Sequence, residues 1–395
     1  MTPLELRALL PILSEYTWLN AAASSPTPQP VYDAMERHLR ETRDQGDLHY
    51  PSWARFKAAV RTRLATFIGA TPEELAFTPS TSFGFHVIAK FLSARGVREV
   101  LTLETEFPST TLPLLHDGLV LRGVRPRPDG SYPLADLEAA ITPETGAVAL
   151  SVVQYASGYR IDLEGVSRLC RERGLTLCLN AAQALGQVPL DVSALGATFL
   201  AATSHKWFMG GYGVGTLFIR RDWLEAGPLP IAGWLSVAPE EQFQPFVNAE
   251  REEDAHGFTA WGTRMRKEAS ALEAGGGSWV GLHGVNAALS LHEAVGVSTT
   301  LAHNVELQLE LRRRLRDRGF VPNSPDTPAT MSGICVVPVQ GDPLETVRAL
   351  VKEHQVVTTP RGGGLRLSTH VFNTMEDVER VVFALDRLGV RPKAA

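Results

Sequence analysis

Short apolar runs alternate with amphipathic segments from about residue 75 onward. The runs that predict strands lie at 74–78, 98–103, 119–124, 146–153, 175–180, 197–203 and 213–220. Segments with the spacing of helices lie upstream at 53–67 and between several of the runs, at 82–94, 108–117, 134–140 and 162–174. Apolar strands that alternate with helices are typical of βαβ units. We therefore predict an α/β fold in which helices sandwich a mostly parallel sheet.

The alternation stops after Arg220, and residues 221–280 show no regular pattern. The segments that follow predict two long helices, a strand, a helix, strand-like pieces and a final helix, at 281–296, 298–319, 333–339, 344–354, 356–369 and 375–388. This order is typical of an α+β domain. We divide the chain into an N-terminal arm at 1–20, a large domain at 21–284 and a small C-terminal domain at 285–395.

Composition and charge narrow the class of protein. The 395-residue chain is 44% hydrophobic and 21% charged, which is ordinary for a soluble globular protein. Its formal net charge of −5 argues against a nucleic-acid partner, and no apolar run approaches the length of a membrane span. The N-terminal residues lack the pattern of a secretory signal. Three cysteines without metal-ligand spacing suit a reducing compartment, so we expect a cytoplasmic protein without a metal site.

Polar residues follow several of the predicted strands. In an open parallel sheet, ligands bind at the carboxyl ends of the strands, so these positions are the candidate site. Ser80, Thr81 and Ser82 open a helix after the strand at 74–78. Hydroxyls and unpaired backbone N–H groups at a helix N-terminus suit a phosphate. The simpler interpretation is that a hydroxyl only caps the helix.

Lys206 follows the strand at 197–203 and precedes a glycine-rich loop. A lysine there loses hydration, which lowers the pKa of its amine and makes it a nucleophile; a surface lysine at a turn is the alternative. Two other strand ends carry the ring of Phe107 and the amides of Asn180 and Gln183. A phosphate site, a flat ring, a polar amide and a lysine are the partners that a planar phosphorylated aldehyde needs. This combination indicates pyridoxal phosphate.

Several longer stretches resemble the class V aminotransferase family of fold-type I pyridoxal-phosphate enzymes, which includes cysteine desulfurases and isopenicillin N epimerase-like proteins. The stretches that carry the resemblance are "WLNAAASSPTP" (18–28), "FTPSTSFGFHVIA" (77–89), "SGYRIDLEGVSRLCRERGLTLCLNAAQALGQVPLDV" (157–192), "TSHKWFMGGYGVGTLFIR" (203–220) and "GGLRLSTHVFNTMEDVERVVFAL" (363–385). Together they cover nearly the whole chain. The lysine block and "LRLSTHVFNT" are the specific parts of the resemblance.

The resemblance implies how the cofactor would be anchored. Lys206 would link covalently to the cofactor aldehyde and later act as base and acid at the substrate Cα. The phosphate would be held by Thr81, Ser82, Thr203 and His205. His205 has an alternative role as a core histidine bonded to the backbone.

The resemblance also implies contacts to the cofactor ring. Phe107 would stack on the pyridine, with a hydrophobic plug under the loop as its alternative. Gln183 would hydrogen-bond the phenolic oxygen, or merely cap the next helix. Tyr155 would lie near the cofactor, or serve as ordinary packing. Asn180 would lie beneath the ring nitrogen.

Arg366 would bind the substrate α-carboxylate, because a guanidinium fork matches a carboxylate in shape and charge. Arg366 alternates with Leu365 and Leu367, so its side chain points away from theirs. A buried structural salt bridge is the alternative. Arg361 is a weaker second candidate, with an ordinary surface position as its alternative.

The sequence departs from the family's pattern at three places. Desulfurases that form a persulfide carry a cysteine on the loop before the arginine, whereas this loop reads "PRGGGLR". Gly276 stands where relatives have a threonine that reaches the neighbouring subunit's phosphate. Asn180 stands where the family has an aspartate, whose charge keeps the pyridine nitrogen protonated. An amide N–H favours an unprotonated nitrogen, which should impair transamination more than β-elimination.

We therefore predict a homodimeric pyridoxal-phosphate enzyme that acts at Cα of an amino acid, most simply as a β-eliminating lyase of the carbon–sulfur type. One alternative is an epimerase, with Tyr155, His370 or a residue of the partner subunit as a second base. Others are an aminotransferase of the same family, and a catalytically impaired protein that only binds the cofactor. We expect the substrate side-chain pocket within residues 221–280 and the partner subunit.

Overall fold

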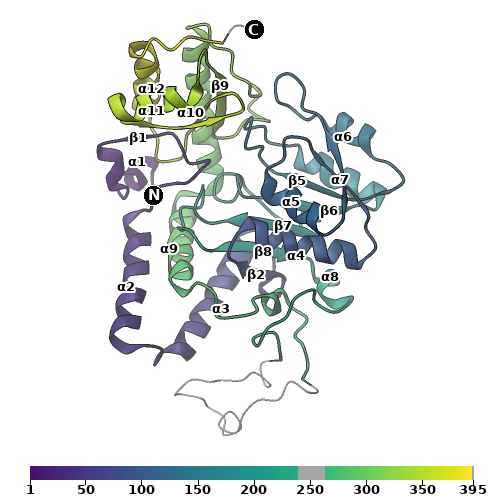
Figure 1. Cartoon of the computed structure of the whole chain (residues 1–395). Coiled ribbons are helices and arrows are strands. Elements are labelled where there is room, and N and C mark those ends of the chain that lie inside the picture. Colours follow the sequence, from purple (N-terminus) through teal and green to yellow (C-terminus); the bar gives the residue numbers. More distant parts are fainter. Residues whose placement is uncertain (239–262, 394–395) are drawn as a thin grey trace.

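The computed structural model describes residues 1–238 and 263–393, and a seven-stranded sheet lies at its centre (Figure 1). The strands run in the spatial order β2-β8-β7-β6-β5-β3-β4. Their bounds are β2 (Leu75–Thr78), β3 (Glu99–Leu103), β4 (Val120–Val124), β5 (Thr145–Ser151), β6 (Thr176–Asn180), β7 (Phe199–Thr203) and β8 (Gly215–Ile219). Of these strands, β8 is antiparallel to both neighbours and the other pairs are parallel. The predicted α/β class with a mostly parallel sheet is confirmed.

Helices cover both faces of this sheet. The helices associated with it are α2 (Gln29–Gln45), α3 (Tyr50–Phe67), α4 (Thr81–Ala94), α5 (Pro108–His116), α6 (Leu134–Ala140), α7 (Leu163–Arg173), α8 (Arg221–Glu225) and α9 (Trp279–Val295). Helix α2 lay outside the predicted elements, although its buried residues Val31, Ala34 and His38 recur at helical spacing in an otherwise mostly polar sequence.

Alternate residues of a single strand enter two separate hydrophobic cores. In β6, Leu177 and Leu179 join the core that contains residues of α3, α7 and α9. Cys178, between them, joins the core that contains residues of α4. Because successive side chains of a strand point to opposite faces, this division shows that the sheet is buried on both sides. That burial explains why the strands read as continuous apolar runs.

A second sheet, three strands wide, is built from the C-terminal part of the chain. Its antiparallel order is β11-β12-β9, with bounds β9 (Ile334–Pro338), β11 (Thr359–Arg361) and β12 (Gly364–Ser368). It packs with α10 (Val297–Arg316), α11 (Pro343–His354) and α12 (Met375–Arg387) around a third core. The strand-like segment at 356–369 is interrupted, because β10 (Val356–Val357) pairs with β1 (Thr17–Trp18) instead. The proposed division into an arm and two domains stays a prediction.

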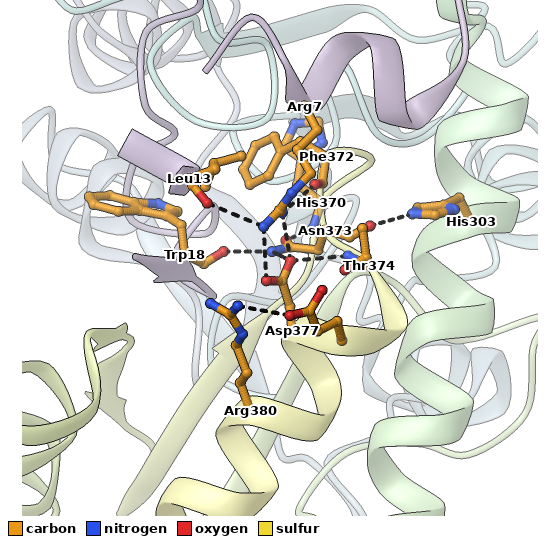
Figure 2. Close-up of polar contacts among 11 residues, drawn as sticks. Arg7, Leu13, Trp18, His303, His370, Phe372, Asn373, Thr374, Asp377 and Arg380 are labelled. Carbon is orange, nitrogen blue, oxygen red and sulfur yellow. Dashed lines mark hydrogen bonds and ion pairs between the residues drawn. The ribbon is translucent and has the colours of Figure 1, made fainter. Parts of the chain in front are cut away.

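The N-terminal residues are held against the turn that follows β12 (Figure 2). Arg7, the last residue of α1 (Pro3–Arg7), binds both carboxylate oxygens of the buried Asp377, at 2.8 and 3.2 Å. The Asn373 side chain donates to the Trp18 carbonyl at 3.0 Å and to Asp377 at 2.9 Å. The "VFNTMED" stretch of the sequence therefore joins the two ends of the chain.

Candidate active site

A cavity of about 290 Å³ lies where the ends of several strands of the large sheet meet the small sheet. It is lined by Ala22, Ala23, Ser80, Thr81, Ser82, Phe107, Ser109, Ala182, Gln183, Thr203, His205, Lys206, Arg361 and Arg366. All the predicted site residues except Asn180 and Tyr155 are among these, and those two contact lining residues. The cavity is thus at the carboxyl ends of the parallel strands, as predicted for ligands of such sheets.

Lys206 lines this cavity from the loop that follows β7. The loop is held by hydrogen bonds from Gly210 N–H to the Ser204 carbonyl at 2.8 Å and from Ser204 Oγ to the Val214 carbonyl at 2.7 Å. Met209 adopts a φ of 57°, which is rare for a non-glycine residue and lets the chain turn sharply after the lysine. A tightly bonded loop fixes the position of the amine.

The Lys206 amine is far less basic than a lysine in water. Burial, followed by the nearby charges of Arg366 and Arg361, lowers its pKa from 10.5 to about 8. Its Nζ lies 5.4 Å from the centroid of the Phe107 ring. A substantial fraction of the amine is therefore uncharged near neutral pH, and an uncharged amine is the nucleophile that attacks an aldehyde.

The N-terminus of α4 forms one end of the cavity. Ser80 caps this helix, because its Oγ accepts the Phe83 N–H at 3.2 Å. The next hydroxyl, Thr81 Oγ1, is buried and has no hydrogen-bond partner among the described residues. A buried hydroxyl without a hydrogen-bond partner lowers the stability of the fold unless a ligand supplies the missing hydrogen bond. The cap and the candidate phosphate ligand are therefore different residues.

Thr203 and His205 lie opposite this helix end and are bonded to each other, with 2.8 Å between Thr203 Oγ1 and His205 Nδ1. Burial and the neighbouring Lys206 lower the pKa of His205 to about 4, so the imidazole is neutral at physiological pH. Its ring stacks on Tyr212 at 4.2 Å. A neutral imidazole can donate one hydrogen bond to an anion, but it is a poor base.

Asn180 ends β6 just beneath the cavity, and its amide orientation is determined by its neighbours. The Ala182 N–H donates to Asn180 Oδ1 at 2.9 Å, so the nitrogen points the other way. Nδ2 donates to Thr110 Oγ1 at 2.8 Å and lies 3.5 Å from Ser109 Oγ. Both amide N–H groups therefore have a hydroxyl within hydrogen-bond distance, and the contact with Ser109 is the longer of the two.

Gln183 is also held at both ends of its amide. The Trp207 indole N–H donates to Gln183 Oε1 at 2.7 Å, and Gln183 Nε2 donates to the Ala22 carbonyl at 2.9 Å. Because the indole is a donor only, the amide nitrogen must face the cavity side. Its second N–H is the group expected to meet an oxygen of the cofactor.

Phe107 lines the cavity from the loop after β3, and Tyr155 packs edge-on against it at 5.0 Å. The preceding residue, Glu106, is buried and accepts bonds from the backbone N–H groups of Phe107 and Ser151, at 2.8 and 2.7 Å. Burial raises the pKa of Glu106. Glu106 thereby ties the loop that carries Phe107 to the end of β5, a role that the sequence analysis missed.

Two arginines enter the cavity from the small sheet. Arg366 is almost completely buried, and burial followed by the charge of Arg361 lowers its pKa to about 10. Among the described residues, its side chain makes one hydrogen bond, from Nη1 to the Tyr155 carbonyl at 3.3 Å, and Nε has no partner there. No carboxylate pairs with it in the part of the chain that the structure describes, so the structural salt bridge is not observed.

One residue that the sequence suggested as a second base, His370, lies outside the cavity lining. Its Nδ1 accepts the Val371 N–H at 2.7 Å and its Nε2 meets the Trp207 carbonyl at 2.8 Å. Burial lowers its pKa to about 3. Both ring nitrogens are thus occupied, and His370 is wrong as a second base. Of the region 221–280 expected to form the side-chain pocket, residues 239–262 lie outside the described residues.

Ser109 and Thr110 were not identified from the sequence, although both lie in the first turn of α5. The available signal was their position directly after a strand end, in "EFPSTT". Glu106 carried a similar signal, as a charged residue that follows an apolar strand. Their partners, Asn180 and Ser151, are distant in the sequence, so the contacts themselves could not be read from it.

The fold and the cavity fit an enzyme class that uses a phosphorylated aldehyde as its cofactor. The unpartnered Thr81 hydroxyl, the weakly basic Lys206 amine and the unpaired Arg366 fit the phosphate, the aldehyde and a substrate carboxylate. Residues 17–381 match the model of the family "Aminotransferase class-V". The chain belongs to this family, and pyridoxal phosphate is its cofactor.

Individual relatives are distant. The chain is 26% identical over 96% of its length to an uncharacterized aminotransferase, YcbU, of Bacillus subtilis, covering 96% of that protein. It is 28% identical over 94% of its length to an isopenicillin N epimerase of Amycolatopsis lactamdurans, covering 95% of it. The structure resembles an apo cysteine desulfurase of Thermococcus onnurineus, with a TM-score of 0.87, 24% identity and 98% of each chain covered.

Proposed function

We propose that this protein is a pyridoxal-phosphate-dependent lyase that removes a β-substituent from an α-amino acid, with a carbon–sulfur bond as the favoured one to break. The observation that carries this proposal is the single base in the cavity. Lys206 has a pKa near neutrality, His205 is too weak a base, and no carboxylate lines the cavity among the described residues.

One base is sufficient for β-elimination. The bound cofactor supplies an electron sink for the pair of electrons left when a bond to Cα breaks. Lys206 accepts the proton from Cα and, as an ammonium, donates it to the departing group at Cβ. Arg366 holds the α-carboxylate by a charge-assisted bidentate pair. Thr81, Ser82, Thr203 and His205 hold the phosphate, and Phe107 covers one face of the ring.

Asn180 supports elimination over transamination. An amide N–H released from the 3.5 Å contact with Ser109 would donate to an unprotonated ring nitrogen, whereas a carboxylate in place of the amide would stabilise the protonated ring. Transamination depends more strongly on electron withdrawal by that ring than β-elimination does. The same residue motivates the competing proposal of a cofactor-binding protein without turnover.

A desulfurase that forms a persulfide on its own cysteine is not supported, although several relatives bear that name. Cys170, Cys178 and Cys335 are all buried, and none lines the cavity. Burial raises the pKa of each thiol, to about 12 for Cys170. Thiols of this kind are poor nucleophiles. The sulfur atom would instead be released as part of the substrate's own side-chain fragment, without transfer to a cysteine of the protein.

An epimerase is the second candidate, because one relative is an isopenicillin N epimerase. Epimerisation needs a base on each face of Cα. Tyr155 is the nearest described candidate on this chain, since its ring meets Phe107 and its carbonyl accepts from Arg366. Without Tyr155, a residue of the partner subunit would have to supply the second base.

We further propose a homodimer. Tyr212, beside the cavity, is 68% exposed, and Tyr32 and Leu39 on α2 are 52% and 53% exposed. Large apolar side chains exposed near a site are typical of subunit contacts. Sedimentation of the holoenzyme would report twice the 43.0 kDa chain mass if this is right.

The decisive experiment compares products from L-cysteine and β-chloroalanine in D₂O. Release of pyruvate and ammonia supports the lyase. Deuterium at Cα with no net product supports the epimerase, and conversion of a keto acid to an amino acid supports the aminotransferase. Cofactor bound without any exchange at Cα supports a binding protein. A Lys206→Ala variant is the control, and it should abolish every one of these reactions.

A further inference from the structure

We propose that Arg361 selects substrates whose side chain carries a second anionic group, a carboxylate or a sulfur oxyanion. This inference rests on the proposed function and deepens it by naming the substrate class. Arg361 lines the same cavity as Lys206 and Arg366. Arg361 is an exposed residue, and its guanidinium has no hydrogen bond or ion pair with any described residue.

The geometry of the small sheet places both arginines on one face. Thr359 of β11 lies directly opposite Arg366 of β12, and directly paired residues share a face of a sheet. Arg361 is two residues from Thr359, so its side chain returns to that same face. The two guanidinium groups therefore leave the hairpin in the same direction, toward the cavity.

The hairpin turn holds Arg361 in position. Gly362 and Gly363 form the two-residue turn, with φ values of 58° and 75°. Two consecutive positive φ angles are what a type I′ turn requires, and glycine adopts them without strain. A Cβ on Gly364 would lie 2.2 Å from the Val337 carbonyl oxygen, so the strand next to Arg361 packs closely on β9.

The charges in the cavity leave Arg361 without a partner. Lys206 is used by the cofactor aldehyde, hydroxyls and the α4 N-terminus suit its phosphate, and Arg366 suits the α-carboxylate. No acidic side chain lines the cavity among the described residues. The charge of Arg361 is close enough to lower the pKa of both Lys206 and Arg366. An unpaired guanidinium beside an occupied one suits a substrate with two acidic groups.

The first test measures binding of unreactive acids to the holoenzyme by calorimetry. Succinate and glutarate are compared with butyrate and valerate, in which a methyl group replaces one carboxylate. We expect the dicarboxylates to bind about tenfold more tightly, as for one added charge-assisted pair. Arg361→Gln should remove this preference without weakening the monocarboxylates. Arg361→Lys should retain part of the preference.

Arg387→Gln is the matched control, because it removes an exposed charge at the end of α12 and should leave the preference intact. A wild-type protein without the preference, or a preference that survives in Arg361→Gln, would overturn the proposal. Equal weakening of both classes of acid would mean that Arg361 shares the α-carboxylate, which also overturns it. Loss of affinity for pyridoxal phosphate would assign Arg361 to the cofactor instead.

A second readout separates this inference from the proposed function. Cα deuterium exchange is followed for aspartate against asparagine, with Arg361→Gln expected to raise KM for aspartate alone. If neutral amino acids alone are processed, the lyase proposal stands and the selectivity proposal fails. If the holoenzyme binds dicarboxylates preferentially but releases no pyruvate from any β-substituted substrate, the selectivity proposal stands and the lyase proposal fails.

Discussion

The lowered pKa of Lys206 predicts how fast the cofactor-free protein takes up pyridoxal phosphate. Only the neutral amine attacks the aldehyde. A pKa of about 8 leaves about 9% of the amine neutral at pH 7, whereas an ordinary value of 10.5 leaves about 0.03%. At equal intrinsic reactivity the protein should therefore react about 300 times faster than a free lysine side chain at pH 7.

The sign of the pH dependence follows from the same shift. The uptake rate should rise about tenfold per pH unit below pH 8 and level off above it, because the amine is then already neutral. Stopped-flow absorbance would follow the covalent link, with N-acetyl-lysine amide in the same buffers as the reference for the cofactor's own ionisation. Lys206→Ala should show no absorbance change.

Arg366→Gln provides an internal check on the cause of the shift. Removing this nearby cation should raise the pKa of Lys206 and move the plateau to higher pH. A logarithmic rate that continues to climb to pH 10 in the unmodified protein, parallel to the free amine, would refute the reasoning. It would mean that the Lys206 amine is solvated and not buried beside two guanidinium groups.

Three further predictions test other parts of the structure. Asn180→Asp should raise transaminase activity relative to elimination, because a carboxylate stabilises the protonated form of the ring nitrogen; an unchanged ratio of transamination to elimination products would remove that argument. Asp377→Ala should lower the free energy of unfolding by about 3 kcal/mol in urea titrations, because it leaves Arg7 and Asn373 without their buried partner, and Asp386→Ala on the surface should cost under about 1 kcal/mol. Glu106→Gln should cost about 2 kcal/mol, because the new amide N–H groups face the donors of Ser151 and Phe107; stability equal to the unmodified protein would show that the carboxylate is already protonated.

The sequence by itself determined the main sheet and showed that Lys206 directly follows one of its strands. Strands buried on both faces leave continuous apolar runs, and glycine after Lys206 marks a tight loop, so both signals are local and readable. The polar residues at strand ends were readable for a similar reason, since a charge or amide directly after an apolar run is conspicuous. Helix α2 carried a helical pattern in Val31, Ala34 and His38, and it was missed because its sequence is mostly polar.

Only the tertiary structure decided how those side chains are oriented and which charges share the cavity. The Ala182 N–H and the Trp207 indole set the directions of the Asn180 and Gln183 amides. Arg361 reads from sequence as a surface residue, yet the hairpin turns it onto the face that lines the same cavity as Lys206. Periodicity reports which face of an element is buried, but not which distant element covers it. That choice depends on packing between separate segments of the chain, such as the Lys206 loop and the Arg361 hairpin, where the chemistry of this site is assembled.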